Sequence, residues 1–240
     1  QVSETALSPS TVADLEELWR VDGVDGVTGT PTIVGRFVYF GGWDGTLRAV
    51  DSTTGAPRWT TTLTTGAVDD TVTIAGGSLL VGDSEGHLHR VDRFSGAVRW
   101  TTLLDAHPDT RIYSSPIVVG DLVVIGVAST ELAVPKADYT FRGSVVALDL
   151  ATGAEVWRTY VTDGTTHGAG GSVWSSAAYD AGRGLLYIGT GQSYEAPASP
   201  LTDSLLALRL TDGTIAWSRQ FTAGDVFTFW NMAGPDADIG

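Results

Sequence analysis

The segment Ala147-Leu-Asp-Leu-Ala-Thr-Gly-Ala-Glu-Val-Trp157 recurs, with changes, four times along this chain of 240 residues, and it decides the fold. In every copy a glycine stands four residues before the tryptophan, where it can supply the positive φ of a tight turn between two strands. The repeat therefore predicts four similar β units. The other copies are Ala49-Val-Asp-Ser-Thr-Thr-Gly-Ala-Pro-Arg-Trp59, Arg90-Val-Asp-Arg-Phe-Ser-Gly-Ala-Val-Arg-Trp100 and Ala207-Leu-Arg-Leu-Thr-Asp-Gly-Thr-Ile-Ala-Trp217.

The spacing of the repeat tryptophans predicts a β-propeller. They lie 41, 57 and 60 residues apart, and the shortest spacing fits one four-stranded blade of about 40 residues. The second strand of each unit alternates apolar residues, as a buried face of period two requires. These residues are Val38 and Phe40, Leu79 and Val81, Val123 and Ile125, and Leu186 and Ile188. The sequence thus predicts an all-β propeller of four four-stranded blades, whose tryptophans pack one blade on the next.

Strand ranges follow from this alignment. The first blade is expected at 28–34, 37–42, 46–51 and 57–63, and the second at 67–75, 78–82, 87–92 and 98–104. The third is expected at 112–119, 122–127, 144–149 and 155–161, and the fourth at 172–179, 185–190, 204–209 and 215–221.

The chain is expected to be a single propeller or half-propeller domain over residues 1–240. Residues 1–17 would form an arm with a short helix capped by Ser10 or Thr11, residues 18–221 the blades, and residues 222–240 a tail leading toward a fifth blade. Residues 18–21 are predicted to be a lone strand, of the kind that completes the last blade of a ring. An open half-ring would expose its edges, so we expect a truncated chain or assembly with a second half.

Composition excludes several function classes. Lys and Arg total 14 and Asp and Glu total 28, for a net charge of −14. This balance argues against nucleic acid or an anionic membrane as a partner. The chain has no cysteine, so disulfides, thiolate zinc sites, iron–sulfur clusters and covalent c-type haem are excluded within it. No apolar run approaches the ~20 residues of a membrane span, and no signal peptide is visible.

Long polar segments are predicted to gather at one mouth of the propeller. In a blade, the loop between the second and third strands lies on the same face as the connection to the next blade. Insertions at 129–143 and 192–203, the connection at 162–171 and the tail from 222 therefore meet there, and such loops usually carry the site. His87, His89, His107 and His167 show no metal-ligand spacing, and we interpret them as structural.

The repeat, of the form Ala-x-Asp-x-x-Thr-Gly-x-x-x-Trp, resembles the tryptophan-docking motif of pyrroloquinoline quinone (PQQ) dehydrogenases, which are eight-bladed propellers. The resemblance covers nearly the whole chain, but only about the N-terminal half of a family propeller. Non-enzymatic outer-membrane assembly lipoproteins share the repeat. The stretch Gly171-Ser-Val-Trp174, followed by Leu186-Tyr-Ile-Gly-Thr-Gly191-Gln192, looks like the quinone-floor and calcium-ligand region. Thr140-Phe-Arg-Gly143 and Gly234-Pro-Asp-Ala-Asp-Ile-Gly240 look like the polyvinyl alcohol dehydrogenase branch.

The resemblance implies PQQ and calcium as cofactors, with no haem in this chain. The indole of Trp174 would stack on the planar quinone. Arg111 would pair with a quinone carboxylate, and Tyr113 and Ser129 would face the cofactor. The implied metal ligands are Glu131, Gln192 and Asn231, because calcium takes six to eight oxygen ligands.

The resemblance also implies a carboxylate base beside the quinone. Asp225 is our choice, with Asp236 and Asp238 as alternatives, because the family's usual base position here carries Asn231, which cannot be a base. A second departure is that Asp138 and Tyr139 stand where many members have adjacent cysteines.

The leading hypothesis is PQQ- and calcium-dependent oxidation of a secondary or polymeric alcohol, such as polyvinyl alcohol, with cytochrome c as electron acceptor. The alternative is a non-catalytic scaffold that binds protein or ligand at the same mouth. A third hypothesis is an inactive half-propeller that pairs with a second half or with itself as a homodimer. The resemblance implies a periplasmic or secreted protein.

Overall fold

The computed structural model describes residues 7–236 together with 238 and 239. It contains four antiparallel sheets, each built on four strands consecutive in the chain, and the two-residue strand β9 (Thr110–Arg111) adds a fifth to the third sheet by pairing with the second strand of that sheet. The predicted all-β architecture of four blades is therefore confirmed. Sheet one comprises β1 (Thr32–Val34), β2 (Phe37–Gly41), β3 (Thr46–Asp51) and β4 (Pro57–Thr62), and sheet two β5 (Thr73–Ala75), β6 (Ser78–Gly82), β7 (His87–Asp92) and β8 (Val98–Leu103). Sheet three comprises β10 (Ile117–Val119), β11 (Leu122–Ser129), β12 (Ser144–Asp149) and β13 (Glu155–Tyr160), and sheet four β14 (Ala178–Asp180), β15 (Leu185–Gly189), β16 (Ser204–Arg209) and β17 (Ile215–Gln220).

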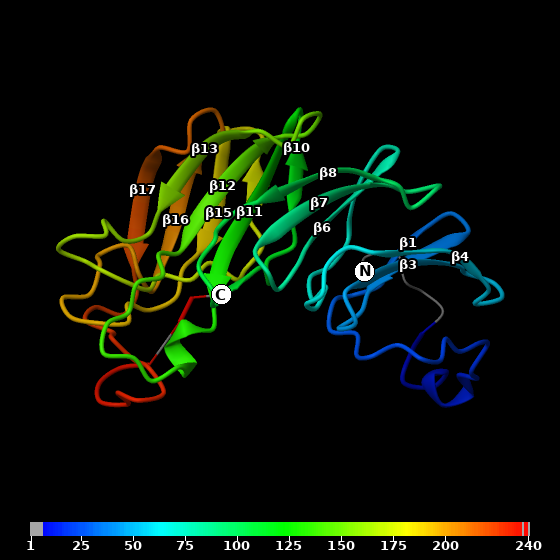
Figure 1. Cartoon of the computed structure of the whole chain (residues 1–240), viewed down its shortest axis with the longest axis horizontal. Coiled ribbons are helices and arrows are strands. Elements are labelled where there is room, and N and C mark those ends of the chain that lie inside the picture. The colour runs from blue at the N-terminus through cyan, green and yellow to red at the C-terminus, as the bar shows by residue number, and fades with distance from the viewer. Residues whose placement is uncertain (1–6, 237, 240) are drawn as a thin grey trace.

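The sheets follow one another in an open arc, from sheet one at the right of Figure 1 to sheet four at its left. A separate cluster of buried apolar residues lies between each pair of consecutive sheets. The eight alternating residues of the second strands are all buried, as predicted. A fourth cluster covers the outer face of sheet one, where Trp19, Val21 and Val24 pack on Val38 and Phe40. None of the clusters among the described residues joins sheet one to sheet four.

The innermost strand of each blade is three residues long, much shorter than the predicted ranges. In sheets two, three and four, the segment before the innermost strand hydrogen-bonds to the preceding blade, although before β10 the short strand β9 also pairs with β11 of its own sheet. The backbone N–H of Val68 donates to the carbonyl of Gly42, that of Ile112 to Asp83, and that of Val173 to Val127. These bonds satisfy the backbone without sheet pairing, so the apolar pattern predicted strands where the chain forms bridges between blades.

The N-terminal segment agrees with its prediction only in part. A short helix is present, the 3-10 helix η1 (Val12–Asp14) with Thr11 at its N-cap, but the Thr11 side chain makes no capping hydrogen bond. The prediction of a strand over residues 18–21 is wrong. Side chains anchor this segment instead, because Trp19 and Val21 pack on sheet one and the indole N–H of Trp19 donates to the carbonyl of Ser52 at 2.9 Å.

The repeat tryptophans lock consecutive blades together, as predicted. The indole N–H of Trp59 donates to the carbonyl of Arg93, and those of Trp100 and Trp157 donate to Leu150 and Leu210, at 2.9–3.1 Å. Each ring also lies flat against the repeat glycine of the next blade. A Cβ added at these glycines would come within 2.4–2.8 Å of the ring, so the positive φ and the close approach both require glycine.

The two ends of the arc differ in how this contact is made. Trp19 lies against Gly55 of sheet one in the same way that the other tryptophans lie against their glycines, so it occupies the place of a preceding blade's tryptophan. Trp217, the tryptophan of the fourth copy, is 43% exposed. Sheet four therefore presents an unused docking tryptophan at the open end of the arc.

Candidate functional site

The loops of sheets three and four meet the C-terminal tail, as their topology predicted. The turn η2 (Glu131–Ala133) and the tail lie along the lower edge of Figure 1. The backbone N–H of Phe229 donates to the carbonyl of Leu132 at 3.1 Å, and the indole N–H of Trp230 donates to Ala133 at 3.3 Å. The tail thus closes over the insertion that carries Glu131.

A cavity of about 320 Å³ lies beneath this contact. It brings together three of the predicted cofactor residues, Tyr113, Ser129 and Trp174, which come from three separate segments of the chain. Most of the wall is apolar and three of the lining residues are aromatic, which suits a flat, mainly apolar ring. The remaining lining residues are Ala128, Thr130, Leu132, Ala133, Ser172 and Phe229.

Trp174 is held by the glycine that precedes Gln192. A Cβ at Gly191 would lie 2.3 Å from the indole ring of Trp174 and 3.3 Å from a carboxylate oxygen of Asp238. The backbone N–H of Gln192 donates to that same carboxylate at 3.2 Å. Gly191 therefore lets the indole, the Gln192 segment and Asp238 approach one another, and larger residues at this position would force them apart.

A buried hydroxyl network supports the cavity from behind, and the sequence did not predict it. The hydroxyl of Tyr194 lies 3.1 Å from Ser129 Oγ and 2.8 Å from Ser172 Oγ. Burial raises the pKa of Tyr194 to about 12, so it stays a neutral donor. The only signal in the sequence was the run of polar residues Gln192-Ser193-Tyr194, and it does not reveal their hydrogen-bond partners.

Glu131 is fully buried and its carboxylate is already neutralised. Oε1 lies 2.9 Å from Lys136 Nζ and 3.2 Å from His107 Nε2, while Oε2 accepts the backbone N–H of Phe141 at 2.8 Å and Thr140 N–H at 3.2 Å. Burial alone would raise the pKa of Glu131, but these donors together hold it below its ordinary value. The single lysine of the chain thus occupies the position beside Glu131 that a cation would take.

The other two predicted metal ligands lie in different surroundings. Gln192 is buried, and its side-chain amide donates to the carbonyl of Phe227 at 3.4 Å. Asn231 is exposed in a turn, where its backbone bonds only Thr228. The structure therefore brings Gln192 close to Asp238 and Trp174, and leaves Asn231 on the surface of the tail.

The candidate base Asp225 is buried, and Oδ1 accepts the backbone N–H of Phe227 at 3.0 Å. Its charge acts on Asp203, a fully buried residue of the inner loop that the sequence analysis did not single out. Neither carboxylate oxygen of Asp203 accepts a hydrogen bond from the described residues. Burial, together with the charges of Asp225, Asp238 and Asp236, raises the pKa of Asp203 to about 8.

We expect Asp203 to make the chain less stable as the pH rises from about 4 to about 8. Its carboxyl is neutral in the folded state below pH 8 but ionises near pH 3.9 when unfolded, so ionisation favours unfolding across this window. Asp203→Asn should flatten this loss, and asparagine tolerates the positive φ of 50° found there. Urea denaturation at pH 5, 7 and 9 with a chelator measures it. Equal pH profiles for both proteins would contradict the assignment.

Arg111 and Tyr113 lie on either side of a neighbouring cavity of about 470 Å³. The guanidinium of Arg111 donates to the carbonyls of Ser84 and Thr110 at 3.0 and 2.6 Å, so it is anchored to the backbone, and it does not line the cavity of Trp174. Tyr139 packs edge-on against Tyr194, whose hydroxyl belongs to the buried network, with ring centroids 5.7 Å apart.

Known proteins share this arrangement of blades and loops. A family described as outer membrane protein assembly factor BamB matches residues 10–223. The chain belongs to this family. The match confirms the PQQ-repeat propeller that the tryptophan motif predicted.

Individual relatives are alcohol dehydrogenases. The chain is 27% identical over 162 residues to a polyvinylalcohol dehydrogenase of Pseudomonas sp., which covers 57% of this chain and 25% of that protein. It is 28% identical over 257 residues to the quinohemoprotein alcohol dehydrogenase ADH IIB of Pseudomonas putida, covering 89% of this chain and 30% of that protein. The chain therefore spans less than a third of the length of these relatives.

Solved structures agree with the fold. The quinohemoprotein alcohol dehydrogenase ADHIIG of Pseudomonas putida HK5 superposes with a TM-score of 0.74 at 27% identity, covering 87% of this chain and 36% of that one. A europium-containing methanol dehydrogenase, at 22% identity and a TM-score of 0.76, shows the shared fold. Among the described residues, no helix is long and apolar enough to cross a membrane.

Proposed function

We propose that the cavity of Tyr113, Ser129 and Trp174 binds a PQQ-type quinone, and that the assembled propeller oxidises an alcohol. The observation that supports this is that residues implied by the resemblance, far apart in the sequence, line one cavity. The similarity to quinohemoprotein and polyvinyl alcohol dehydrogenases points to the same class of reaction. Bound in this cavity, such a quinone would accept hydride from the alcohol. The substrate would be a secondary or polymeric alcohol.

In this proposal the residues of the chain bind the quinone and orient it. Trp174 would stack on the ring, and the Ser129–Ser172–Tyr194 network would hold one wall of the cavity in place. A carboxylate would accept the hydroxyl proton of the alcohol. Asp225 remains our choice of base, and Asp238 is the alternative that lies directly beside the Gln192 segment and Trp174.

We propose that calcium binds at Glu131 only if Lys136 releases that carboxylate. Glu131 offers calcium an oxygen ligand only if the Lys136 ammonium moves away, since the two groups are 2.9 Å apart. Asn231 would have to turn inward from its exposed position, whereas Gln192 is already buried and directly follows Gly191, which lies against Trp174. The residues as they stand do not fit a calcium ion at Glu131, so no step of the reaction is assigned to one.

The proposed partners follow from the open arc. Trp217 at its end is exposed, and we propose that a fifth blade, supplied by a longer chain, a second half or a second copy, covers it to complete an eight-bladed ring. Cytochrome c is the proposed electron acceptor, as in the methanol dehydrogenase relative whose name carries it. A periplasmic or secreted location is proposed from the same relatives.

A PQQ titration of the purified chain, followed by tryptophan fluorescence with and without calcium, tests the proposal. We expect saturable quenching in the wild type and its loss in Trp174→Ala, because the indole forms the stacking surface. Trp217→Phe is the matched control, because that ring is exposed and lies outside the cavity. Comparison of Glu131→Ala with the wild type shows whether calcium acts through that carboxylate.

The second candidate function is a non-catalytic scaffold. The neutralised Glu131 and the exposed Asn231 favour it, and so does the assembly-factor description of the family. Absence of PQQ binding by a well-folded protein would reject catalysis for this chain and leave the scaffold.

A further inference from the structure

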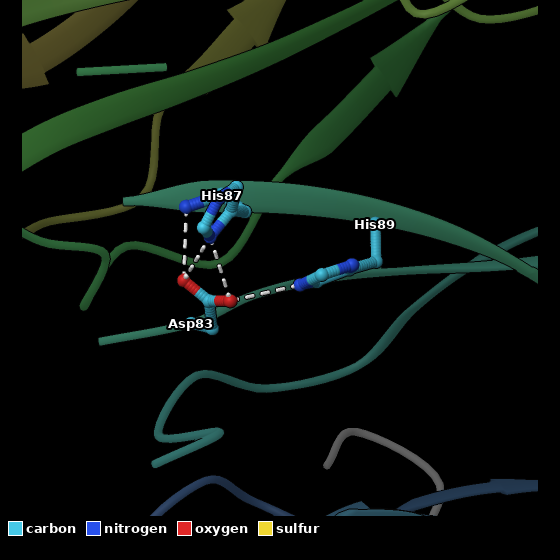
Figure 2. A group of neighbouring side chains, drawn as sticks. All are labelled: Asp83, His87 and His89. Carbon is cyan, nitrogen blue, oxygen red and sulfur yellow. Dashed lines mark hydrogen bonds and ion pairs between the residues drawn. The ribbon is translucent and has the colours of Figure 1, made fainter. Parts of the chain in front are cut away.

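Three side chains of the second blade converge on one point. Asp83 follows β6, and His87 and His89 lie on the same face of β7. In Figure 2 both imidazole rings point toward the carboxylate of Asp83. His89 Nε2 lies 2.9 Å and His87 Nδ1 3.1 Å from the same oxygen, Oδ2. One ligand atom from each of the three residues, a ring nitrogen of each histidine and a carboxylate oxygen, lies within 4.8 Å of the other two.

The other blades lack this set. The strand register places Gly42, Thr46 and Arg48 of sheet one at the positions of Asp83, His87 and His89. There Arg48 is paired with Asp44. The equivalent residues of sheet three are Val127, Ser144 and Val146. Those of sheet four are Thr190, Ser204 and Leu206. The blade architecture therefore does not need two histidines and an aspartate here, and the second blade alone among the four carries them.

The surroundings fix the orientation of the ligands. Asp83 and His89 are buried, with 0% and 2% exposure. His89 Nδ1 lies 2.9 Å from Thr101 Oγ, which leaves Nε2 directed at the carboxylate. The backbone N–H groups of Glu85 and His87 both donate to Asp83 Oδ1 at 2.9 Å, so Oδ2 is the oxygen left for a metal. Such outer bonds orient metal ligands and set their tautomers.

The local charge favours a cation. Asp70 is buried nearby, and one of its oxygens has no hydrogen-bond partner among the described residues. Burial, together with the negative charges of Asp69 and Asp83, raises the pKa of Asp70 well above its ordinary value. The chain's other group of histidine and carboxylates, His107, Asp109 and Glu131, already holds the ammonium of Lys136. Among the described residues, the ion-pair partners of Asp83 are His87 and His89, and no lysine or arginine pairs with it.

We propose that Asp83, His87 and His89 bind a divalent transition-metal ion such as Zn²⁺. Imidazole nitrogen and carboxylate oxygen suit this class of ion, and bonds of ~2.0–2.2 Å in a tetrahedral site place ligand atoms about 3.3 Å apart. The observed separations of 2.9 and 3.1 Å need only a small opening of the site. His87 lines a cavity of about 580 Å³, through which the ion and a water as fourth ligand can enter.

Titration of the metal-free full chain with Zn²⁺ by calorimetry tests the proposal, with the visible absorption of Co²⁺ as a second readout of coordination geometry. We expect one equivalent bound per chain, a Co²⁺ spectrum of four-coordinate type, and a rise in Tm with Zn²⁺. His87→Ala and Asp83→Asn should each weaken Zn²⁺ binding at least tenfold and abolish the Tm rise. His87 is part-exposed, so its variant tests the site even if Asp83→Asn fails to fold.

His167→Ala is the matched control. His167 and Asp163 have the same i,i+4 spacing as His87 and Asp83, and their atoms are 2.8 Å apart, but they belong to no three-residue metal-ligand group among the described residues. Its Zn²⁺ binding should equal that of the wild type. Absence of stoichiometric binding, or wild-type affinity in His87→Ala, would overturn the proposal and leave a hydrogen-bonded His–Asp–His group. Because none of these variants touches the quinone cavity, the result does not depend on PQQ binding.

Discussion

Trp100→Ala is expected to destabilise the chain by about 3 kcal/mol, whereas Trp217→Ala should cost less than about 1 kcal/mol. The two residues hold the same position of the repeat. Trp100 packs against the core between sheets two and three and donates to Leu150 at 3.1 Å. Trp217 is 43% exposed and contacts mainly the ring of Tyr187. Both variants replace tryptophan by alanine, so the difference between their free energies of unfolding measures how much the docking of one blade on the next contributes.

Urea denaturation of both variants at fixed protein concentration checks this prediction. A loss of about 3 kcal/mol matters because domains of this kind are stable by only about 5–15 kcal/mol. Equal losses for the two variants would contradict it, since Trp217 would then be covered in solution. A molar mass measurement on the same samples would show whether a second copy covers it, as the homodimer hypothesis requires.

The repeat made the blades predictable. A glycine four residues before a tryptophan sets the turn and the docking contact within 11 residues. The second, third and fourth strands therefore begin and end within one residue of the ranges expected, apart from β11, which extends two residues further to Ser129. The innermost strands could not be predicted to the same accuracy. Their preceding segments bond to the neighbouring blade, and an apolar pattern does not distinguish a strand partner in its own sheet from one in the next.

The site was predictable only in outline. Topology placed the long loops at one mouth, and the cavity of Tyr113, Ser129 and Trp174 is found there. Tertiary contacts decided the rest. The ion pair of Lys136 with Glu131 joins residues five apart across an irregular turn, and Asp83 meets His89 only because β6 and β7 pair in register. The spacing of the histidines alone contained no sign of the carboxylate between them.

The second large effect on stability is expected at Lys136. Lys136→Met is expected to destabilise the chain by about 2–3 kcal/mol at pH 7, because it keeps the apolar stem but leaves the buried Glu131 carboxylate without its main cation. The cost falls below the full value for a broken buried pair because His107 and the N–H groups of Thr140 and Phe141 remain. Adding Glu131→Gln should recover part of the loss, since the buried group is then neutral.

The pH dependence separates this charge effect from lost packing. The pKa of Glu131 is lowered in the folded state, so its stabilisation is present above the unfolded pKa near 4.3 and is lost as the pH falls through the folded value. The cost of Lys136→Met should therefore be largest near pH 7 and shrink toward pH 3, while a packing defect would cost the same at both. Calcium should stabilise the variant more than the wild type, because Glu131 is then free to act as an oxygen ligand. If calcium stabilises neither protein, the carboxylate of Glu131 only holds its own loop in place, and the metal part of the dehydrogenase proposal has to rest on Gln192 and Asn231.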